Sequence, residues 1–322
     1  MVTDRAPMPR LVADIGGTNA RFARFFDERC ELTSERTLPC GNYAGPVAAI
    51  ESYLRDTGAA RPHEIAMAVA TQVSRDEIKL TNNHWAFSVE ATRKALGVER
   101  VLMLNDFTAL ALSLPHLKPA ELRKIGGGAP AKNAAIGLIG AGTGLGVSGL
   151  IPTRDGWVPI EGEGGHVSFS PANEREVAVL KIVWREFPHV SAERLISGIG
   201  LDPLYRAMAL LENKSGSVPA PAEISDRALS GDAFCADVLN TFCAMLGTTA
   251  GNLAVTLGAR GGIYIGGGIV PKLGEFFDRS PFRERFESKG RFSSYLAAIP
   301  NYVILAEYPA LVGAARALLR TT

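Results

Sequence analysis

Two glycine-rich runs constrain this chain more than any other feature of its sequence. The first reads Asp14-Ile15-Gly16-Gly17-Thr18-Asn19 and follows the apolar residues 11–13; the second, residues 140–146, reads Gly-Ala-Gly-Thr-Gly-Leu-Gly and follows the apolar residues 135–139. Glycine adopts positive φ without strain and lets backbone N–H groups approach an anion, and the threonine in each run adds a hydroxyl donor. The pair predicts two phosphate-binding loops that face each other across a cleft.

The composition is typical of a soluble globular protein. Of the 322 residues, 47% are hydrophobic and 21% are charged, and this composition argues against disorder. The length is sufficient for two domains. The net charge of +1 provides no overall attraction to nucleic acid or to an anionic membrane, so we expect neither as a partner. Residues 1–10 contain no apolar segment typical of a signal peptide, and no apolar run is expected to be long enough to span a bilayer.

The cysteines do not have the spacing of a metal or redox site. Cys30, Cys40, Cys235 and Cys243 form no Cys-x-x-Cys pair. Cys235 and Cys243 lie in a segment with helical apolar spacing, where a buried thiol is more common than a metal ligand. We therefore expect a protein of the reducing cytoplasm.

Apolar periodicity predicts an α/β fold in two parts. A Pro- and Gly-rich crossover at residues 115–133 separates two segments that each begin strand, glycine turn, strand, which suggests a duplicated unit. We expect a small domain of residues 1–115 plus 307–322 and a large domain of residues 116–306. The predicted strands are residues 11–13, 21–26, 65–69, 101–104, 135–139, 147–151, 263–265 and 302–306; the predicted helices are residues 47–54, 89–96, 107–114, 174–187, 203–211, 233–257 and 309–320.

One motif is a false match. Residues 144–149 fit Gly-x-Gly-x-x-Gly, the pattern of dinucleotide-binding folds, which requires a helix to begin there. Residues 147–151 instead have the pattern of a strand, so this function is excluded. The P-loop pattern Gly-x-x-x-x-Gly-Lys-Ser/Thr does not occur either.

Two acids stand at the ends of apolar strands. Asp14 precedes the first glycine run, where a carboxylate is costly unless it holds a cation or hydrogen-bond donors; it could hold Mg²⁺ through water, although the run could also be a plain hairpin turn. Asn105 and Asp106 end the strand at 101–104, at the edge where open α/β sheets place ligands. Asp106 suits a general base that accepts a hydroxyl proton, or alternatively caps the helix that follows it.

A second polar group follows the second glycine run. Residues 161–166, Glu-Gly-Glu-Gly-Gly-His, present Glu163 and His166, which could bind neighbouring hydroxyls of a sugar. Glu193 could join them, or could simply stabilise a helix beginning at residues 191–194. Gly266, Gly267 and Gly268 follow a buried strand, and serve either close helix packing or a flat surface for a nucleotide.

The motifs resemble, in order and across nearly the whole chain, those of the bacterial glucokinase family, the non-ROK branch of the hexokinase and actin-like ATPase superfamily. The match is carried by residues 14–19, 81–88, 104–109, 140–146, 162–166, 189–194, 251–254 and 266–271. The resemblance implies two ribonuclease-H-like lobes around a central cleft, ATP-dependent phosphorylation of glucose at its 6-hydroxyl, and a homodimer. The zinc-binding cysteine cluster of ROK kinases is absent.

The resemblance also implies a role for each candidate residue. Asp106 would be the catalytic base, and the sugar would be bound by Asn105, Asp106, Glu163, His166 and Glu193. Asp14 would bind Mg²⁺ through water. The nucleotide ATP would be bound by Asp14, Gly16, Gly17, Thr18, Asn19, Gly142, Thr143, Gly144, Gly266, Gly267 and Gly268.

Two positions depart from the family pattern. Thr71-Gln72 stands where family members carry Gly-Pro or Cys-Pro, and Glu161 replaces a proline before Gly162. Neither change removes a candidate catalytic group. Two other functions remain open: a kinase for another hexose, such as mannose, fructose or N-acetylmannosamine, and a sugar-sensing or scaffold protein without turnover.

Overall fold

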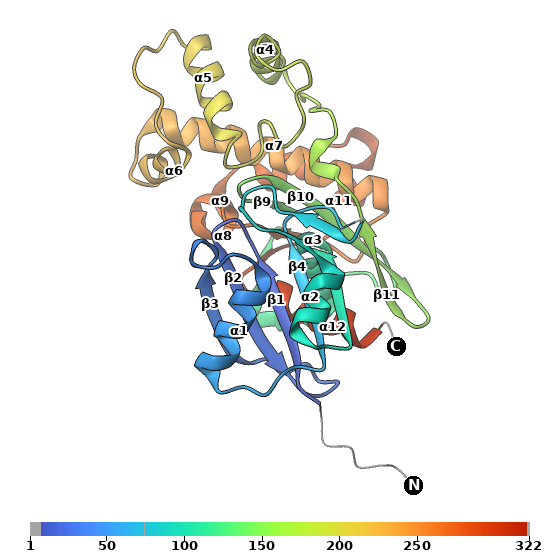
Figure 1. Cartoon of the computed structure of the whole chain (residues 1–322). Helices are drawn as coiled ribbons and strands as arrows, with labels where there is room; N and C mark the ends of the chain where they lie inside the picture. The colour runs from blue at the N-terminus through green and yellow to red at the C-terminus, as the bar shows by residue number, and fades with distance from the viewer. Residues whose placement is uncertain (1–7, 74, 321–322) are drawn as a thin grey trace. The chain divides into compact units, whose positions relative to one another are not determined.

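The computed structural model describes residues 8–73 and 75–320 (Figure 1). Contacts divide the chain into two compact units. Residues up to Leu117 and from Ala306 onward form unit 1, and residues Lys118–Leu305 form unit 2. Most of the N-terminal stretch in which no signal peptide is expected, residues 1–7, lies outside the described residues.

Unit 1 contains a five-stranded sheet in the order β3-β2-β1-β4-β7. β1 pairs antiparallel with β2, and β2 pairs antiparallel with β3, whereas β1, β4 and β7 are parallel. These strands are Arg10–Ile15 (β1), Asn19–Phe25 (β2), Thr33–Pro39 (β3), Glu64–Val69 (β4) and Arg100–Asn105 (β7). A short separate hairpin consists of β5 (Glu77–Lys79) and β6 (Ala86–Ser88).

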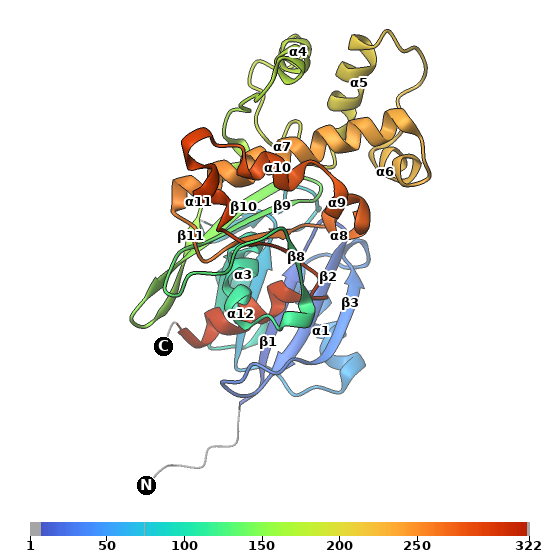
Figure 2. The same ribbon diagram turned by 180° about the vertical axis from the view of Figure 1, so that it is seen from behind.

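Helices cover both faces of this sheet because successive side chains of a strand point to opposite faces. In β1, Leu11 belongs to a core shared with α1 (Pro46–Thr57) and α2 (Val89–Leu96), and its neighbour Val12 belongs to a core shared with α12 (Pro309–Arg320). Figure 1 shows α1 and α2 on one face, and the view from behind in Figure 2 shows α12 on the other. Beside α12 packs α3, which spans Asp106–Ser113.

Unit 2 contains a six-stranded sheet in the order β11-β10-β9-β12-β13-β8. Its strands are Leu122–Ile125 (β8), Ile136–Ala141 (β9), Leu145–Thr153 (β10), Gly156–Glu161 (β11), Ile263–Gly266 (β12) and Asn301–Ile304 (β13). The helices are Glu174–Val183 (α4), Leu201–Leu211 (α5), Pro221–Leu229 (α6), Ala233–Leu257 (α7), Val270–Leu273 (α8), Glu275–Arg279 (α9), Phe282–Glu287 (α10) and Ser293–Ala297 (α11).

The two sheets repeat one strand order. In each, three antiparallel strands (β3-β2-β1 and β11-β10-β9) adjoin two further strands: β4 and β7 run parallel to β1, and β12 and β13 run parallel to β9. The glycine runs form the turns at equivalent places, between β1 and β2 and between β9 and β10. The repeated order agrees with the duplicated unit suggested by the sequence.

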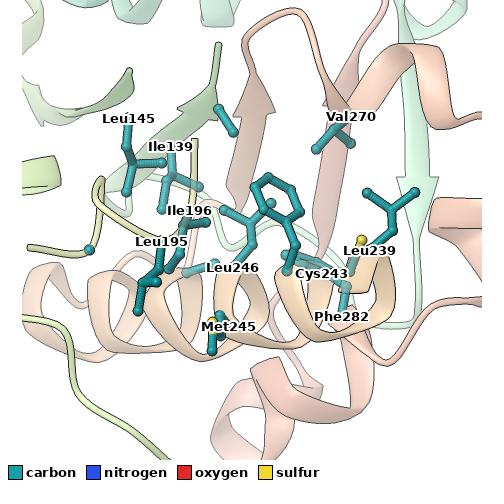
Figure 3. Close-up of a cluster of buried hydrophobic side chains, with 14 of the residues drawn as sticks. Ile139, Leu145, Leu195, Ile196, Leu239, Cys243, Met245, Leu246, Val270 and Phe282 are labelled. Atoms are coloured by element: carbon teal, nitrogen blue, oxygen red, sulfur yellow. The ribbon is translucent and has the colours of Figure 1, made fainter. Parts of the chain in front are cut away.

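The long helix α7 forms the centre of the unit 2 core. Figure 3 shows Leu239, Cys243 and Leu246 on the face of α7 that packs towards Ile139 and Val270. The expectation that no apolar run could span a bilayer is wrong by length and composition, because the 25 residues of α7 meet both criteria. Its most apolar window is nevertheless 72% buried inside unit 2, as the core helix of a globular domain is.

Most predicted elements are present, including α7 and α12 with the expected bounds. Ser88 caps α2 by accepting the N–H of Ala91, and Gly97 ends that helix with φ of 64°. Sequence reasoning missed β3, β11 and the β5–β6 hairpin, and placed β8 within a crossover. The segment 147–151 lies in β10 and not in a helix, which confirms the exclusion of the dinucleotide motif.

Packing of α12 on α3 makes a specific prediction. A Cβ added to Gly313 would overlap the carbonyl oxygen of Ala109 in α3. We expect Gly313→Ala to lower the free energy of unfolding by about 3 kcal/mol, because the clash is with backbone that cannot move aside. Urea denaturation measures this. Gly41→Ala is the control, since a Cβ at Gly41 meets nothing within 4 Å, and an equal loss in both variants would contradict the prediction.

Candidate active site

The first glycine run is a tight turn between β1 and β2 in unit 1. The N–H of Gly16 donates to the carbonyl oxygen of Asn19 at 2.9 Å, and Nδ2 of Asn83 donates to the carbonyl oxygen of Gly16 at 3.2 Å. A Cβ on Gly17 would lie 2.8 Å from the carbonyl oxygen of Asn82. The expectation of positive φ is wrong for Gly16 and Gly17; close approach to backbone is what requires Gly17 to be glycine.

Asp14 lies directly opposite Arg21 on the neighbouring strand. Nη1 of Arg21 is 3.1 Å from Oδ2 of Asp14, and the Asp14 side chain is 19% exposed. Burial raises the pKa of Asp14 above its ordinary value, and Arg21 offsets this only in part. No group of three metal-binding side chains occurs among residues 8–73 and 75–320. A single carboxylate removed from solvent, such as that of Asp14, can hold a cation whose other ligands include water.

Asn105 and Asp106 mark the junction of β7 and α3. Asn105 is the N-cap of α3, because its Oδ1 accepts the N–H groups of Phe107 at 2.9 Å and Thr108 at 3.2 Å. Asp106 is the first residue of the helix, and its Oδ1 accepts the N–H of Phe107 at 2.9 Å. The alternative that Asp106 is the helix cap is therefore wrong.

The sheet brings these groups to one edge of unit 1. In the parallel register, Ile15 of β1 aligns with Val69 of β4, and Val69 aligns with Asn105 of β7. The turn after Asp14 and the junction at Asp106 thus follow the carboxyl ends of strands separated by β4 alone. Open α/β sheets bind their ligands at such an edge. Nearby, Nδ2 of Asn105 donates to the carbonyl oxygen of Thr71 at 3.4 Å, which places one of the two departures from the family pattern beside this group.

In unit 2 the second glycine run lies beside the segment Gly266 to Gly268. Gly140 of β9 aligns with Gly266 of β12, and Gly267, with φ of 80°, lies so close to the backbone of Ala141 that no Cβ would fit. A Cβ on Gly142 would be 4.0 Å from the nitrogen of Gly268. Gly142, Gly144 and Gly146 do not have positive φ, so the expectation is wrong for this run as well. The two predicted nucleotide segments of this unit are therefore adjacent.

The predicted sugar-binding acids of unit 2 adjoin that glycine turn. Gly165 packs directly on the carbonyl oxygen of Leu145, and its own carbonyl accepts the N–H of Glu193 at 2.9 Å. Oε2 of Glu193 accepts the N–H of Leu145 at 2.8 Å. Glu163 and His166 are exposed on either side of Gly165. Glu193 does not begin a helix as expected; α5 starts only at Leu201.

Three residues of the site escaped sequence reasoning. Gly198 donates its N–H to the carbonyl oxygen of Gly142 at 2.7 Å, and Asn82 and Asn83 pack against the first glycine turn. The pattern Ser-Gly-Ile-Gly at residues 197–200 was the available signal for Gly198. Asn82 and Asn83 belong to the quoted motif 81–88, but nothing local indicates what they touch.

Each unit thus presents a glycine turn, and each places acids or amides beside it. The glucokinase family model matches residues 11–321. The chain belongs to the glucokinase family. This confirms the family resemblance and, with the repeated α/β sheets, the predicted fold class.

Relatives and a solved structure agree with this membership. A glucokinase of Chromobacterium violaceum is 54% identical over 310 residues, covering 95% of this chain and 88% of that protein. The bifunctional protein glk of Burkholderia pseudomallei is 53% identical over 312 residues, covering 97% of this chain but 48% of that protein. The present chain thus spans about half the length of that Burkholderia protein. The crystal structure of a glucokinase from an Antarctic psychrotroph has a TM-score of 0.88 at 35% identity, covering 97% of this chain and 99% of that one.

Capping by Asn105 can be tested apart from catalysis. Asn105→Ala removes the acceptor for two N–H groups, and should lower the free energy of unfolding by about 1 kcal/mol. Asn105→Ser keeps an N-cap acceptor and should retain most of that stability. Thermal or urea unfolding measures both variants. Equal losses in the two would contradict the capping role.

The raised pKa of Asp14 predicts how stability depends on pH. Because the pKa of Asp14 is higher in the folded than in the unfolded protein, ionisation of Asp14 opposes folding. The free energy of unfolding should therefore fall as pH rises from the ordinary pKa of an aspartate to the raised pKa of the folded protein. Asp14→Asn should therefore be more stable than the parent at pH 7, and the difference should shrink as pH falls towards 4. Urea unfolding at several pH values measures it.

Asp76 provides a control of opposite sign. A hydrogen bond from Ser88 lowers the pKa of Asp76, so Asp76→Asn should lose stability at neutral pH and recover it as pH falls. A pH-independent difference for Asp14→Asn would mean that burial does not affect its ionisation.

Proposed function

We propose that this chain transfers the γ-phosphoryl group of ATP to the 6-hydroxyl of D-glucose, giving glucose 6-phosphate and ADP. The observation that carries the proposal is the shared sheet edge in unit 1, where the turn after Asp14 and the acid Asp106 follow strands separated by β4 alone. Membership of the glucokinase family supports the choice of reaction.

In this proposal Asp106 is the general base. Its carboxylate accepts the proton of the sugar 6-hydroxyl as that oxygen forms a bond to the γ-phosphorus, and the bond from phosphorus to the β–γ bridging oxygen breaks to release ADP. Asn105 caps α3, so the capping role does not fall on Asp106. Asn105, Glu163, His166 and Glu193 bind the remaining hydroxyls, and an analogue lacking one hydroxyl leaves a polar partner unpaired.

The glycine turns bind the nucleotide. Gly16 to Asn19 and Gly142 to Gly144 direct N–H and hydroxyl donors to the phosphates, and Gly266 to Gly268 support the adenosine. A Mg²⁺ ion would neutralise phosphate charge, and Asp14 would hold it through water. The desolvated state of Asp14 supports this role, because a cation compensates a carboxylate that Arg21 only partly balances.

The remaining proposals concern the assembly and its surroundings. We infer that residues 1–115 plus 307–322 and residues 116–306 are two lobes, that the enzyme is a cytoplasmic homodimer, and that it binds neither nucleic acid nor membrane. Its four free cysteines are buried, which suits a reducing compartment. These assignments rest on family membership and composition.

An ATP-coupled assay with a panel of hexoses tests the reaction. Glucose should give the highest kcat/KM; a higher value with mannose, fructose or N-acetylmannosamine would make the chain a kinase for that sugar. Sugar binding without any product would favour a sensor. Omitting Mg²⁺ should abolish turnover.

Asp106→Asn tests the base. The amide cannot accept the proton, so kcat should fall by a factor of about 10²–10⁴ while glucose and ATP still bind. Steady-state kinetics and calorimetry measure the two effects separately. Asp155→Asn, in the exposed turn between β10 and β11, is the control and should keep parental kcat. Undiminished activity of Asp106→Asn would remove Asp106 from the proposed mechanism.

A further inference from the structure

Glu163 and Glu193 are both expected on the sugar side of the site, yet their surroundings differ. Glu163 is exposed, whereas Glu193 is partly buried and its Oε2 accepts the N–H of Leu145 at 2.8 Å. Leu145 directly follows the glycine turn at 142–144. The carboxylate of Glu193 therefore contacts the nucleotide side of the proposed site.

The fit between Glu193 and the glycine turn is close. A Cβ on Gly144 would overlap Oε2 of Glu193. Since Gly144 does not have positive φ, the backbone itself would accept a side chain there. The Glu193 carboxylate is what occupies the space, so these two residues depend on each other.

The segment that carries Glu193 holds the turn at further points. Gly198 donates its N–H to the carbonyl oxygen of Gly142 at 2.7 Å, and Ile199 donates to that of Thr143 at 3.4 Å. The backbone of Glu193 is fixed in turn, because its carbonyl oxygen accepts the hydroxyl of Ser197 at 2.7 Å.

The same segment is anchored in the core. Leu195 and Ile196 are fully buried, and Figure 3 shows them beside Ile139 and Leu145 above α7. The Glu193 carboxylate thus extends from a rigid support. A carboxylate that accepts a backbone N–H forms a charge-assisted hydrogen bond, stronger than a neutral one.

We propose that Glu193 is a positioning residue for the nucleotide: its carboxylate holds the N–H of Leu145 and so fixes the glycine turn that binds the phosphates. Affinity for nucleotide then depends on Glu193 even when no sugar is present. The inference rests on the proposed function, in which residues 142–144 bind phosphate. It assigns a second role to Glu193, which is also predicted to bind the sugar.

Calorimetric titration with MgADP in the absence of sugar tests this. Glu193→Ala removes the acceptor and should weaken MgADP binding at least fivefold. Glu193→Gln keeps an oxygen that accepts the N–H, and should bind within twofold of the parent because it also removes a negative charge near the phosphates. Parental affinity in Glu193→Ala, or equal weakening in both variants, would overturn the inference.

Glu163→Ala is the matched control. It removes the other sugar-side acid, whose side chain is exposed, so MgADP affinity should stay within twofold of the parent. The glucose KM should still rise in the kinetic assay. Equal weakening of MgADP binding by Glu163→Ala and Glu193→Ala would show that the effect does not depend on the contact with the glycine turn, and would refute a positioning role.

Gly144→Ala provides a second test that leaves Glu193 in place. The new methyl group should displace the carboxylate and weaken MgADP binding, but in the Glu193→Ala background the space is open and the added effect should vanish. Additive losses would contradict the inference. If the parent protein fails to bind MgADP, the proposed function fails as well; if the parent binds and phosphorylates glucose but all variants bind equally, only the inference fails.

Discussion

The proposed site depends on places where two backbone segments lie so close together that no side chain fits between them. Gly165 packs on the carbonyl oxygen of Leu145, Gly267 on Ala141, and Gly17 on Asn82. These contacts, together with the side chains of Asn83 and Glu193, fix where the N–H groups of each turn lie. Close packing of backbone leaves the turns little freedom to move, which is what a binding loop for a charged ligand requires.

The sheets determine which turns and acids come together. Parallel strands end at one edge of a sheet, so the register between β1, β4 and β7 places the Asp14 turn and the Asp106 junction at the same edge, on either side of β4. In unit 2 the pairing of Gly140 with Gly266 does the same for two glycine segments. The buried helix α7 packs against the sheet of unit 2 and supports it.

The sequence predicted an element correctly where its buried face produces a recognisable pattern of apolar residues. A continuous apolar run identified β1, and apolar residues at helical spacing identified α7. It missed β3, Thr-Ser-Glu-Arg-Thr-Leu-Pro, because this edge strand is largely exposed and has no apolar face. It placed Glu193 at a helix start because Ser191-Ala192-Glu193 has the composition of one. The actual turn is set by hydrogen bonds to Gly165 and Leu145, which are distant in sequence.

The two acids nearest the glycine turns differ in how their charge is balanced, and this difference separates their roles. Asp14 is desolvated and only partly compensated by Arg21, so it gains from a cation that arrives with the nucleotide. Glu193 already accepts the backbone N–H of Leu145, directly after the glycine turn. A carboxylate whose charge lacks full compensation suits a ligand that brings positive charge, whereas one that accepts a backbone N–H beside the glycine turn suits positioning. Sequence alone presents both simply as acids beside glycines; only their hydrogen-bond partners distinguish them.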